Sequence, residues 1–303
     1  MNAHANVDPV DASTAGCPFH KESAAAPPSE PFDMHAPDSL TIRSSGDIRS
    51  WLMAGRTFLM QVAHPAVGAG VWEFSSFRHD PWHRLRELDK SGINFVMSGK
   101  TASREEGLRL RRLHKDIQGV DTRGRKYHSL DPLVYGWVHT VFLDSIVTMH
   151  KLYGTPLTRA EEEQLFIEWR QAGRMFGLKD RDMPASLDAY WQYYEHMIET
   201  ELEYTPVVEF MLRNGAPPRP PAFRKMPEWM WRQLWTPVGK LSRTLTLASL
   251  PPAYRAKIAA HQPWTESDER TQARFRAVVR RVVPMLPKRL RYSTPARAAM
   301  CPV

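Results

Sequence analysis

The chain has 303 residues, of which 42% are hydrophobic, 24% charged and 10% aromatic, a composition typical of a globular protein rather than a disordered or fibrous one. Its two cysteines, Cys17 and Cys301, lie near opposite ends, which excludes a disulfide framework and a cysteine-rich zinc or iron–sulfur site. No stretch reaches the roughly 18 uninterrupted apolar residues of a membrane span. The N-terminal segment also lacks the pattern of a secretory signal, so we expect a soluble, cytoplasmic protein.

The formal net charge of +8 is unevenly distributed along the chain. From Arg270 to the end there are nine basic residues and no acidic ones, whereas the preceding 269 residues sum to −1. Because the basic excess is confined to one segment, we do not expect a nucleic-acid-binding protein. Residues 270–297 are interpreted as a solvated basic helix face, with weak contact to a membrane surface or a polyanion as the alternative.

Composition divides the chain into a central region and two arms. Residues 1–38 are rich in Ala, Pro, Ser and Asp, and they are predicted to form a disordered arm. Residues 293–303 are predicted to form a disordered tail for the same reason. Residues 39–292 are expected to form one large helical domain, interrupted by a proline-rich loop at 215–221.

Within residues 39–292 the hydrophobic pattern is helical almost everywhere, and no convincing strand alternation occurs. Asp80 before Pro81 and Asp131 before Pro132 are each an N-cap followed by a proline in the first turn. The helix after Asp131 is apolar nearly all round, so it is predicted to be central and buried. The predicted helices cover about 47–63, 66–77, 80–88, 104–118, 131–153, 158–175, 186–204, 226–235, 241–247, 252–260 and 266–283. The sequence therefore predicts an all-α fold without a sheet.

His114 is the most informative candidate for a cofactor-binding residue. On the predicted 104–118 helix, Leu110, Leu113 and Ile117 form the apolar stripe, and His114 lies about 40° from Leu110, within that stripe. A histidine that faces a protein core must hydrogen-bond, bind a metal or stay neutral at an energetic cost. From the residues alone, a hydrogen-bonded core histidine and a metal ligand both remain open.

Two further histidines lie in the same apolar part of the chain. His139 is flanked by Trp137 and Val138 on the long central helix, so we expect it to be buried. His64 precedes Pro65 at a helix end, where an imidazole can cap the last carbonyl groups. A hydrogen-bonded structural role is the simpler interpretation for both, and a place near a cofactor is the alternative.

Glu73 and Arg84 form the remaining candidate pair. Glu73 occupies a largely apolar segment, where a lone carboxylate would be costly to bury, and Arg84 is an arginine that could pair with it. The alternative is that Glu73 transfers protons in an apolar pocket with a raised pKa. The residues by themselves favour the ion pair.

The order of several short motifs resembles the catalytic domain shared by MpaB-type oxygenases and latex-clearing rubber oxygenases. The resemblance spans about residues 45–292. Each motif is degenerate by itself, and their number and order make the resemblance specific. The motifs are MQVAHP at 60–65, WEFS at 72–75, DPWHRLR at 80–86, RLRRLH at 109–114, YGWVH at 135–139, EEEQLFIEW at 161–169, MPAS at 183–186 and LPKRLR at 286–291.

This resemblance implies an all-α, globin-like helical core that holds one haem b and uses dioxygen to cleave or oxygenate an isoprenoid double bond. The axial haem ligand of rubber oxygenases matches His114, and the arginine on the distal side matches Arg84. The nearest counterpart of the distal glutamate is Glu73. His139 and His64 then become candidates for residues that support the cofactor site.

The chain departs from the rubber enzymes at two positions. Where they place a lysine and a threonine after the distal arginine, this chain has Glu87 and Leu88. A hydrophobic, possibly isoprenoid or lipid-like small molecule is therefore the expected substrate, with dioxygen as the co-substrate. Two alternatives remain: a non-haem or cofactor-free enzyme that uses His64, Glu73, His114 and His139, and a protein that binds haem or lipid without turnover.

Overall fold

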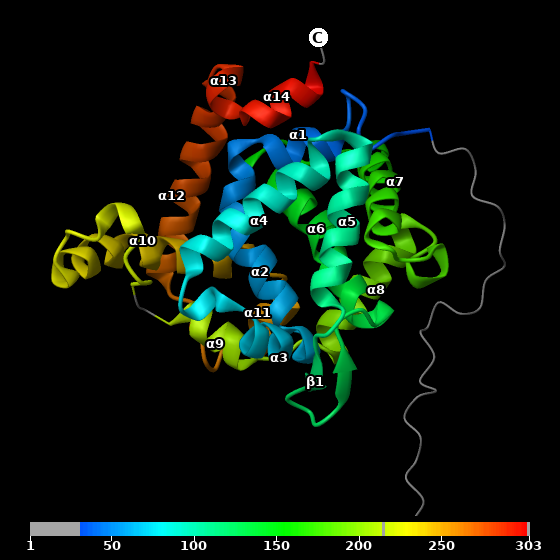
Figure 1. Ribbon diagram of the computed structural model, residues 1–303. Helices are drawn as coiled ribbons and strands as arrows, with labels where there is room; N and C mark the ends of the chain where they lie inside the picture. The colour runs from blue at the N-terminus through cyan, green and yellow to red at the C-terminus, as the bar shows by residue number, and fades with distance from the viewer. Residues whose placement is uncertain (1–30, 214–215, 302–303) are drawn as a thin grey trace, which may run out of the picture.

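The computed structural model describes residues 31–213 and 216–301, and this part of the chain is almost entirely helical (Figure 1). The predicted all-α class is confirmed. No described helix is both long enough and apolar enough to cross a bilayer. The helices are α1 (Leu40–Gly46), α2 (Ala54–Val62), α3 (Pro65–Phe74), α4 (Pro81–Val96), α5 (Gly99–His114), α6 (Pro132–Tyr153), α7 (Arg159–Phe176), α8 (Leu187–Thr200), α9 (Pro206–Leu212), α10 (Glu228–Ser249), α11 (Pro252–Lys257), α12 (Glu266–Val282), α13 (Lys288–Arg291) and α14 (Thr294–Met300).

Local sequence signals explain where several helices begin and end. Asp80 and Asp131 accept hydrogen bonds from backbone N–H groups in the first turns of α4 and α6, and a proline follows each of them. Thr158 and Glu161 form a reciprocal capping box at the start of α7. Gly177 ends α7 at φ 89°, a conformation that favours glycine.

Helix α6 lies in the middle of the bundle, as its apolar sequence predicts (Figure 1). Trp137, Val141 and Leu143 on this helix are almost completely buried. The Trp137 indole also donates a hydrogen bond to the Met60 carbonyl of α2, at 3.0 Å. Because α2, α7 and α8 all pack around this helix, the core is formed by helix–helix contacts.

The prediction of no sheet is wrong at one place. Helix α5 ends at His114, and a short antiparallel hairpin follows, formed by β1 (Gln118–Val120) and β2 (Lys126–His128). Gly124 turns the hairpin at φ 76°. Strands of three residues are too short to show a period-two pattern, so periodicity could not reveal them.

Two of the expected helix boundaries also differ. Helix α4 continues to Val96 rather than ending near Leu88. The two predicted segments at 226–235 and 241–247 are one helix, α10, with Pro237 inside it. Trp231 and Trp235, on the N-terminal side of Pro237, pack against Trp82 and hold that part of the helix in place.

The expectation of a disordered tail is wrong for residues 294–300. They form α14, which begins at the Ser293 cap and packs on α1. Ala296 is completely buried there and occupies the space that a Cβ on Gly46 would need. Small residues on both helices permit this close approach, so an alanine-rich composition did not mean disorder.

The predicted N-terminal arm lies mostly outside the described residues. Residues 1–30 are not described, and the arm's remaining residues, 31–38, contact the helical body. Met34 is completely buried, and its backbone N–H donates to the Gln171 side chain at 2.9 Å. The composition predicted disorder for these residues, but burial of the Met34 side chain holds residues 31–38 against the helical body.

An ion pair in the core ties four helices together. The Arg56 guanidinium on α2 lies 2.6 Å from the Asp144 carboxylate on α6, and both side chains are buried. Tyr194 on α8 donates a hydrogen bond to the same carboxylate, and Arg56 donates to the Ser249 carbonyl at the end of α10. Burial alone would lower the pKa of Arg56, but the Asp144 charge raises it above its ordinary value.

We expect the substitution Asp144→Ala to destabilise the protein by about 3–5 kcal/mol, because it leaves the Arg56 charge buried without a counter-ion. The free energy of unfolding from urea denaturation measures this loss. Glu209→Ala is the control, since it removes an exposed ion pair with Arg213 and should cost less than about 1 kcal/mol. Equal losses in the two variants would contradict the role of the buried pair.

Candidate functional site

The candidate site lies on two consecutive helices, α4 and α5. The helices meet at a tight turn, where Gly99 has φ 83°. Near this turn the Ser91 hydroxyl of α4 donates a hydrogen bond to the Glu106 carboxylate of α5. Away from the turn the two helices diverge, as Figure 1 shows. The residues that the resemblance singles out, Arg84 and His114, lie at this divergent end.

His114 is the last residue of α5 and faces the interior of the protein. It shares the inward side of the helix with Ser103, Glu106 and Gly107, which are buried. Leu113, which the sequence placed on the same apolar stripe, is instead 58% exposed. Ile117, the third residue of that predicted stripe, lies beyond the end of α5, because the helix covers Gly99–His114 rather than 104–118. The predicted stripe is thus not observed, and His114 is half-buried in line with the buried residues of α5.

One hydrogen bond sets the tautomer of the His114 ring. The Nδ1 atom lies 2.7 Å from the Leu110 carbonyl oxygen. Because a carbonyl can only accept, Nδ1 must carry the proton, and the Nε2 lone pair is then available. The Nε2 atom makes no hydrogen bond to any described residue. This is the arrangement that metal-binding histidines adopt in proteins.

The surroundings of His114 favour its neutral form. Burial lowers the pKa of the ring below its ordinary value of 6.5, and the positive charges of Arg84 and Arg109 lower it further. The hydrogen bond to Leu110 opposes this shift without reversing it. At neutral pH the imidazole is therefore uncharged, and its Nε2 atom can bind a metal.

Arg84 lies in the first turn of α4, close enough for its charge to act on His114. Burial lowers the pKa of this guanidinium, and the nearby carboxylate of Glu87 opposes the shift. Burial is only partial, so Arg84 keeps its charge and its five N–H donors. A permanent cation thus lies beside a neutral imidazole.

Exposed apolar side chains flank this pair. Leu113 directly precedes His114 on α5, and Leu88 follows Arg84 by about one turn on α4. Their exposed fractions are 58% and 43%, which is high for leucines next to inward-facing residues. The divergent end of the two helices therefore combines apolar surface, a cation and a free imidazole nitrogen.

His139 is buried, as predicted, but it is not free to bind a metal through Nε2. This nitrogen donates to the Trp169 carbonyl at 2.8 Å, and the Trp169 indole donates back to the His139 carbonyl at 3.0 Å. Tyr135 and Phe176 lie between its ring and that of His114 in a chain of edge-to-face contacts. His139 therefore ties α6 to α7 and supports His114 only indirectly.

His64 lies away from the pair. It is the N-cap residue of α3, its side chain is buried, and its Nδ1 atom has no hydrogen-bond partner among the described residues. The charges that act on it are those of Glu201, Arg125, Asp121 and Arg123, around the β-hairpin. Its predicted capping of the preceding helix is therefore not observed.

The expected burial of Glu73 is wrong. This residue lies on α3 with an exposed side chain, because only part of the apolar segment faces the core. The described residues contain no ion pair between Glu73 and Arg84, and the nearest charged neighbours of Arg84 are Glu87 and Arg109. The charge of Glu73 acts on Tyr127 instead, where it helps to raise the pKa of the phenol after burial.

The sequence left two kinds of metal site open: a haem bound by His114, and a non-haem metal bound by several side chains. The part of the chain that the structure describes has no group of three or more His, Cys, Asp or Glu side chains placed to hold a metal ion. His64, Glu73, His114 and His139 are thus not brought together as one ligand set. His114 by itself offers one neutral imidazole nitrogen that could bind a metal, next to the aromatic ring of Tyr135.

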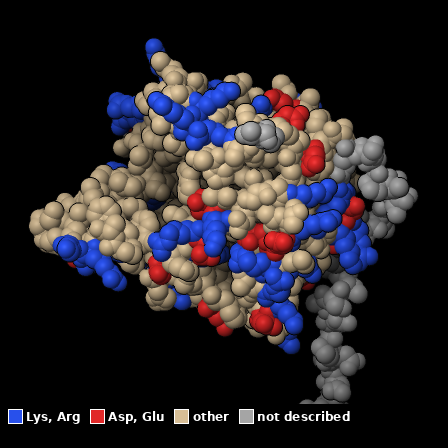
Figure 2. Space-filling model, turned by 45° about the horizontal axis from the view of Figure 1, so that its top comes forward, with Lys and Arg blue, Asp and Glu red and all other residues tan. Residues whose placement is uncertain are grey.

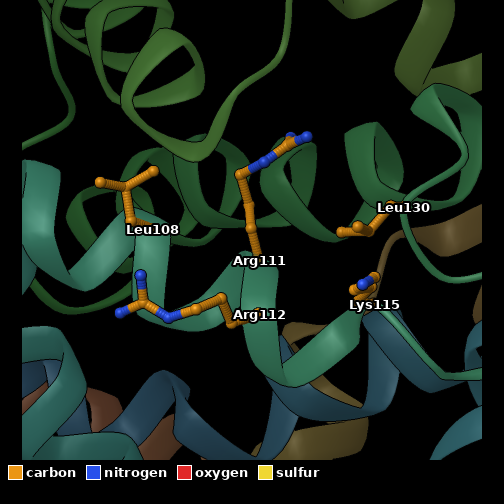
Figure 3. A pocket seen from close by; sticks show the side chains of 5 residues that line it. All are labelled: Leu108, Arg111, Arg112, Lys115 and Leu130. Atoms are coloured by element: carbon orange, nitrogen blue, oxygen red, sulfur yellow. The ribbon is translucent and has the colours of Figure 1, made fainter.

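A separate pocket of about 270 Å³ lies on the outward side of α5 (Figure 3). Its lining residues are Leu108, Arg111, Arg112, Lys115 and Leu130. The Arg111 and Arg112 side chains point in different directions in Figure 3, and Arg111 donates to carbonyl groups at the end of α7. The cations do not converge on one ligand, so this depression is not part of the candidate site.

Two residues near the site were not found from the sequence. Tyr135 contacts the His114 ring edge-on, with 5.9 Å between ring centroids, and burial raises the pKa of its phenol to about 12. Arg109 forms an ion pair with the buried Glu106 carboxylate. The only sequence signal for either residue was its position in a motif, YGWVH for Tyr135 and RLRRLH for Arg109.

Acidification should destabilise the protein through His64 and His139. Burial lowers the pKa of each ring from 6.5 to about 4. Below about pH 6.5 these histidines are protonated in the unfolded chain, whereas in the native protein they stay neutral down to about pH 4. The free energy of unfolding therefore falls as the pH drops from about 6.5 to about 4, by up to about 3 kcal/mol per histidine. Urea denaturation at several pH values should show a shallower loss in His139→Gln than in the exposed control His196→Gln. Equal slopes would contradict this assignment.

Comparison with known proteins identifies the family of the chain. Searches among curated proteins and among solved structures give no match to the chain. Residues 42–281 match the family described as the catalytic domain of the ER-bound oxygenase mpaB/B' and rubber oxygenase. The matched range includes every candidate site residue and most of the helical body. The chain therefore belongs to the mpaB/rubber oxygenase catalytic-domain family.

Proposed function

We propose that this protein is a haem b-dependent oxygenase that uses dioxygen to oxidise an apolar small molecule. The observation that carries the proposal is His114, a neutral imidazole whose Nδ1 is bound to a backbone carbonyl and whose Nε2 is free beside Arg84. Membership of an oxygenase family supports the reaction class. The haem, when bound, supplies the dioxygen chemistry that no amino-acid side chain provides.

His114 is the residue that would hold the haem through its free Nε2 atom. Its bond to the Leu110 carbonyl, at 2.7 Å, orients the ring and keeps the proton on Nδ1. The charges of Arg84 and Arg109 disfavour a second proton, so Nε2 stays free over the neutral pH range. Tyr135 packs against the ring edge and limits its rotation.

Arg84 is the proposed residue on the oxygen side. Its guanidinium presents several N–H donors in a fixed plane, which suits it to hydrogen-bond negative charge that develops on oxygen. The negative charge of Glu87 lies near enough to raise the pKa of Arg84, which helps the guanidinium to keep its charge. We assign no step to Glu73, because its exposed side chain on α3 has no ion pair with Arg84.

The substrate is proposed to be an apolar small molecule of the isoprenoid or lipid-like class. Leu88 and Leu113 offer apolar surface beside the imidazole and the guanidinium. Covering these exposed side chains with an apolar group is favourable, because it removes hydrocarbon surface from water. Glu87 stands where the rubber enzymes have a lysine, so we propose a small molecule rather than a rubber polymer.

The protein purified from haem-replete cells should show a Soret band, and His114→Ala should abolish it. The matched control is His150→Ala, which removes another partly buried histidine, one that hydrogen-bonds to Ser44 at 3.0 Å. That control should keep its haem. A colourless wild-type protein, or a Soret band that survives in His114→Ala with equal haem content, would refute the axial assignment.

Arg84→Ala should keep the haem but lower dioxygen consumption with an apolar alkene substrate by about 100-fold, because it removes the donors on the oxygen side. Arg112→Ala, on the outward side of α5, should leave the rate unchanged. Oxygen-electrode measurements at matched haem content provide the comparison. Binding of the alkene without any oxygen uptake in the wild-type protein would favour a non-catalytic binding protein instead.

A further inference from the structure

The first half of α10 carries an apolar ridge that no described residue covers. Met230, Leu234 and Val238 recur at helical spacing and are 40%, 52% and 48% exposed, and Trp229 beside them is 66% exposed. This half of α10 projects from the body of the protein, as Figure 1 shows at its left edge. Single exposed apolar residues are ordinary, but a continuous ridge of them marks an interaction surface.

The ridge is held in a defined position from another side of the helix. Trp231 and Trp235 on α10 pack edge-on against Trp82 at the start of α4, with ring centroids 6.3 and 5.8 Å apart. The Trp231 indole also donates to the Pro217 carbonyl at 2.7 Å. These contacts hold the first half of α10 in place, so the ridge is exposed on a helix that is fixed to the rest of the protein.

A second apolar strip lies on the neighbouring C-terminal segment. Val278, Val282 and Met285 follow one side of α12 and its extension, and they are 58%, 46% and 78% exposed. Leu290 on α13 is 57% exposed. Thr244 in the second half of α10 donates a hydrogen bond to Asp268 in the first turn of α12, so the two helices that carry these strips are in contact.

Positive charge surrounds both strips. From residue 210 to the end there are 18 basic side chains and four acidic ones, Glu228, Glu266, Asp268 and Glu269. The three acidic residues of α12 lie in its first turn, and no acidic residue follows Glu269. Figure 2 shows the projecting lobe as mostly uncharged with Lys and Arg at its lower edge, and it shows further basic side chains gathered towards the top of the molecule.

We propose that the α10 ridge and the α12–α13 strip together dock the protein on an anionic lipid membrane surface. The acyl chains of such a membrane would cover the apolar side chains of Met230, Leu234 and Val238. Its negative headgroups would attract the surrounding lysines and arginines. Tryptophan, here Trp229, favours the boundary between headgroups and acyl chains. A second copy of the chain fits less well, because it would bring two strongly basic regions together.

The experiment is co-sedimentation of the full chain with vesicles of phosphatidylcholine and phosphatidylserine, compared with vesicles of phosphatidylcholine alone. We expect preferential binding to the phosphatidylserine vesicles, and this binding should weaken as salt is added. Lys288→Glu with Arg289→Glu should lower the binding at least about tenfold. Leu234→Ser with Val238→Ser should lower it by a similar factor, because the ridge no longer enters the lipid.

Matched controls change the same chemistry elsewhere on the surface. Val120→Ser alters an exposed valine on β1, and Lys100→Glu with Arg104→Glu reverses two exposed charges on α5. Both should bind vesicles as the wild-type chain does. The proposal is overturned if phosphatidylserine does not increase binding, if either pair of test variants binds like the wild type, or if light scattering shows a dimer that Leu234→Ser dissociates.

Discussion

A charged pair buried in the core constrains the arrangement of the central helices. Arg56 and Asp144 can be accommodated away from water only when their charges meet at 2.6 Å and the remaining donors and acceptors are satisfied. Tyr194 and the Ser249 carbonyl complete that arrangement, so α2, α6, α8 and α10 are fixed relative to one another. Nonspecific apolar packing would permit several arrangements of these helices, whereas a satisfied charge network permits few.

The candidate site is built on this frame by α4 and α5. Gly107 lets α5 approach α7 closely, since a Cβ there would collide with the Met175 carbonyl. With α5 held at that point, its last turn carries His114 towards α6 and Tyr135, while α4 diverges and brings Arg84 close to the imidazole. The site therefore depends on the angle between two helices, and this angle leaves apolar side chains uncovered beside a free nitrogen.

The proposed docking surface and the candidate site are linked through the start of α4. Trp82, at the start of α4, contacts Trp231 and Trp235 of α10, and Arg84 lies one half-turn later on the same helix. An oxygenase with an apolar substrate would gain from this proximity, because such substrates partition into lipid rather than water. The aromatic cluster around Trp82 is thus a physical link between the projecting helix and Arg84.

The sequence by itself determined the all-α class, the starts of α4, α6 and α7 and the burial of α6, because caps, prolines and apolar periodicity act locally. Tertiary structure alone decided which of these residues share a site. It exposed Glu73 without an ion pair to Arg84, and it engaged the Nε2 atom of His139 with Trp169. It also ordered residues 294–300 as a helix against Gly46. Such contacts join residues far apart in the chain, and neither local propensity nor periodicity carries information about them.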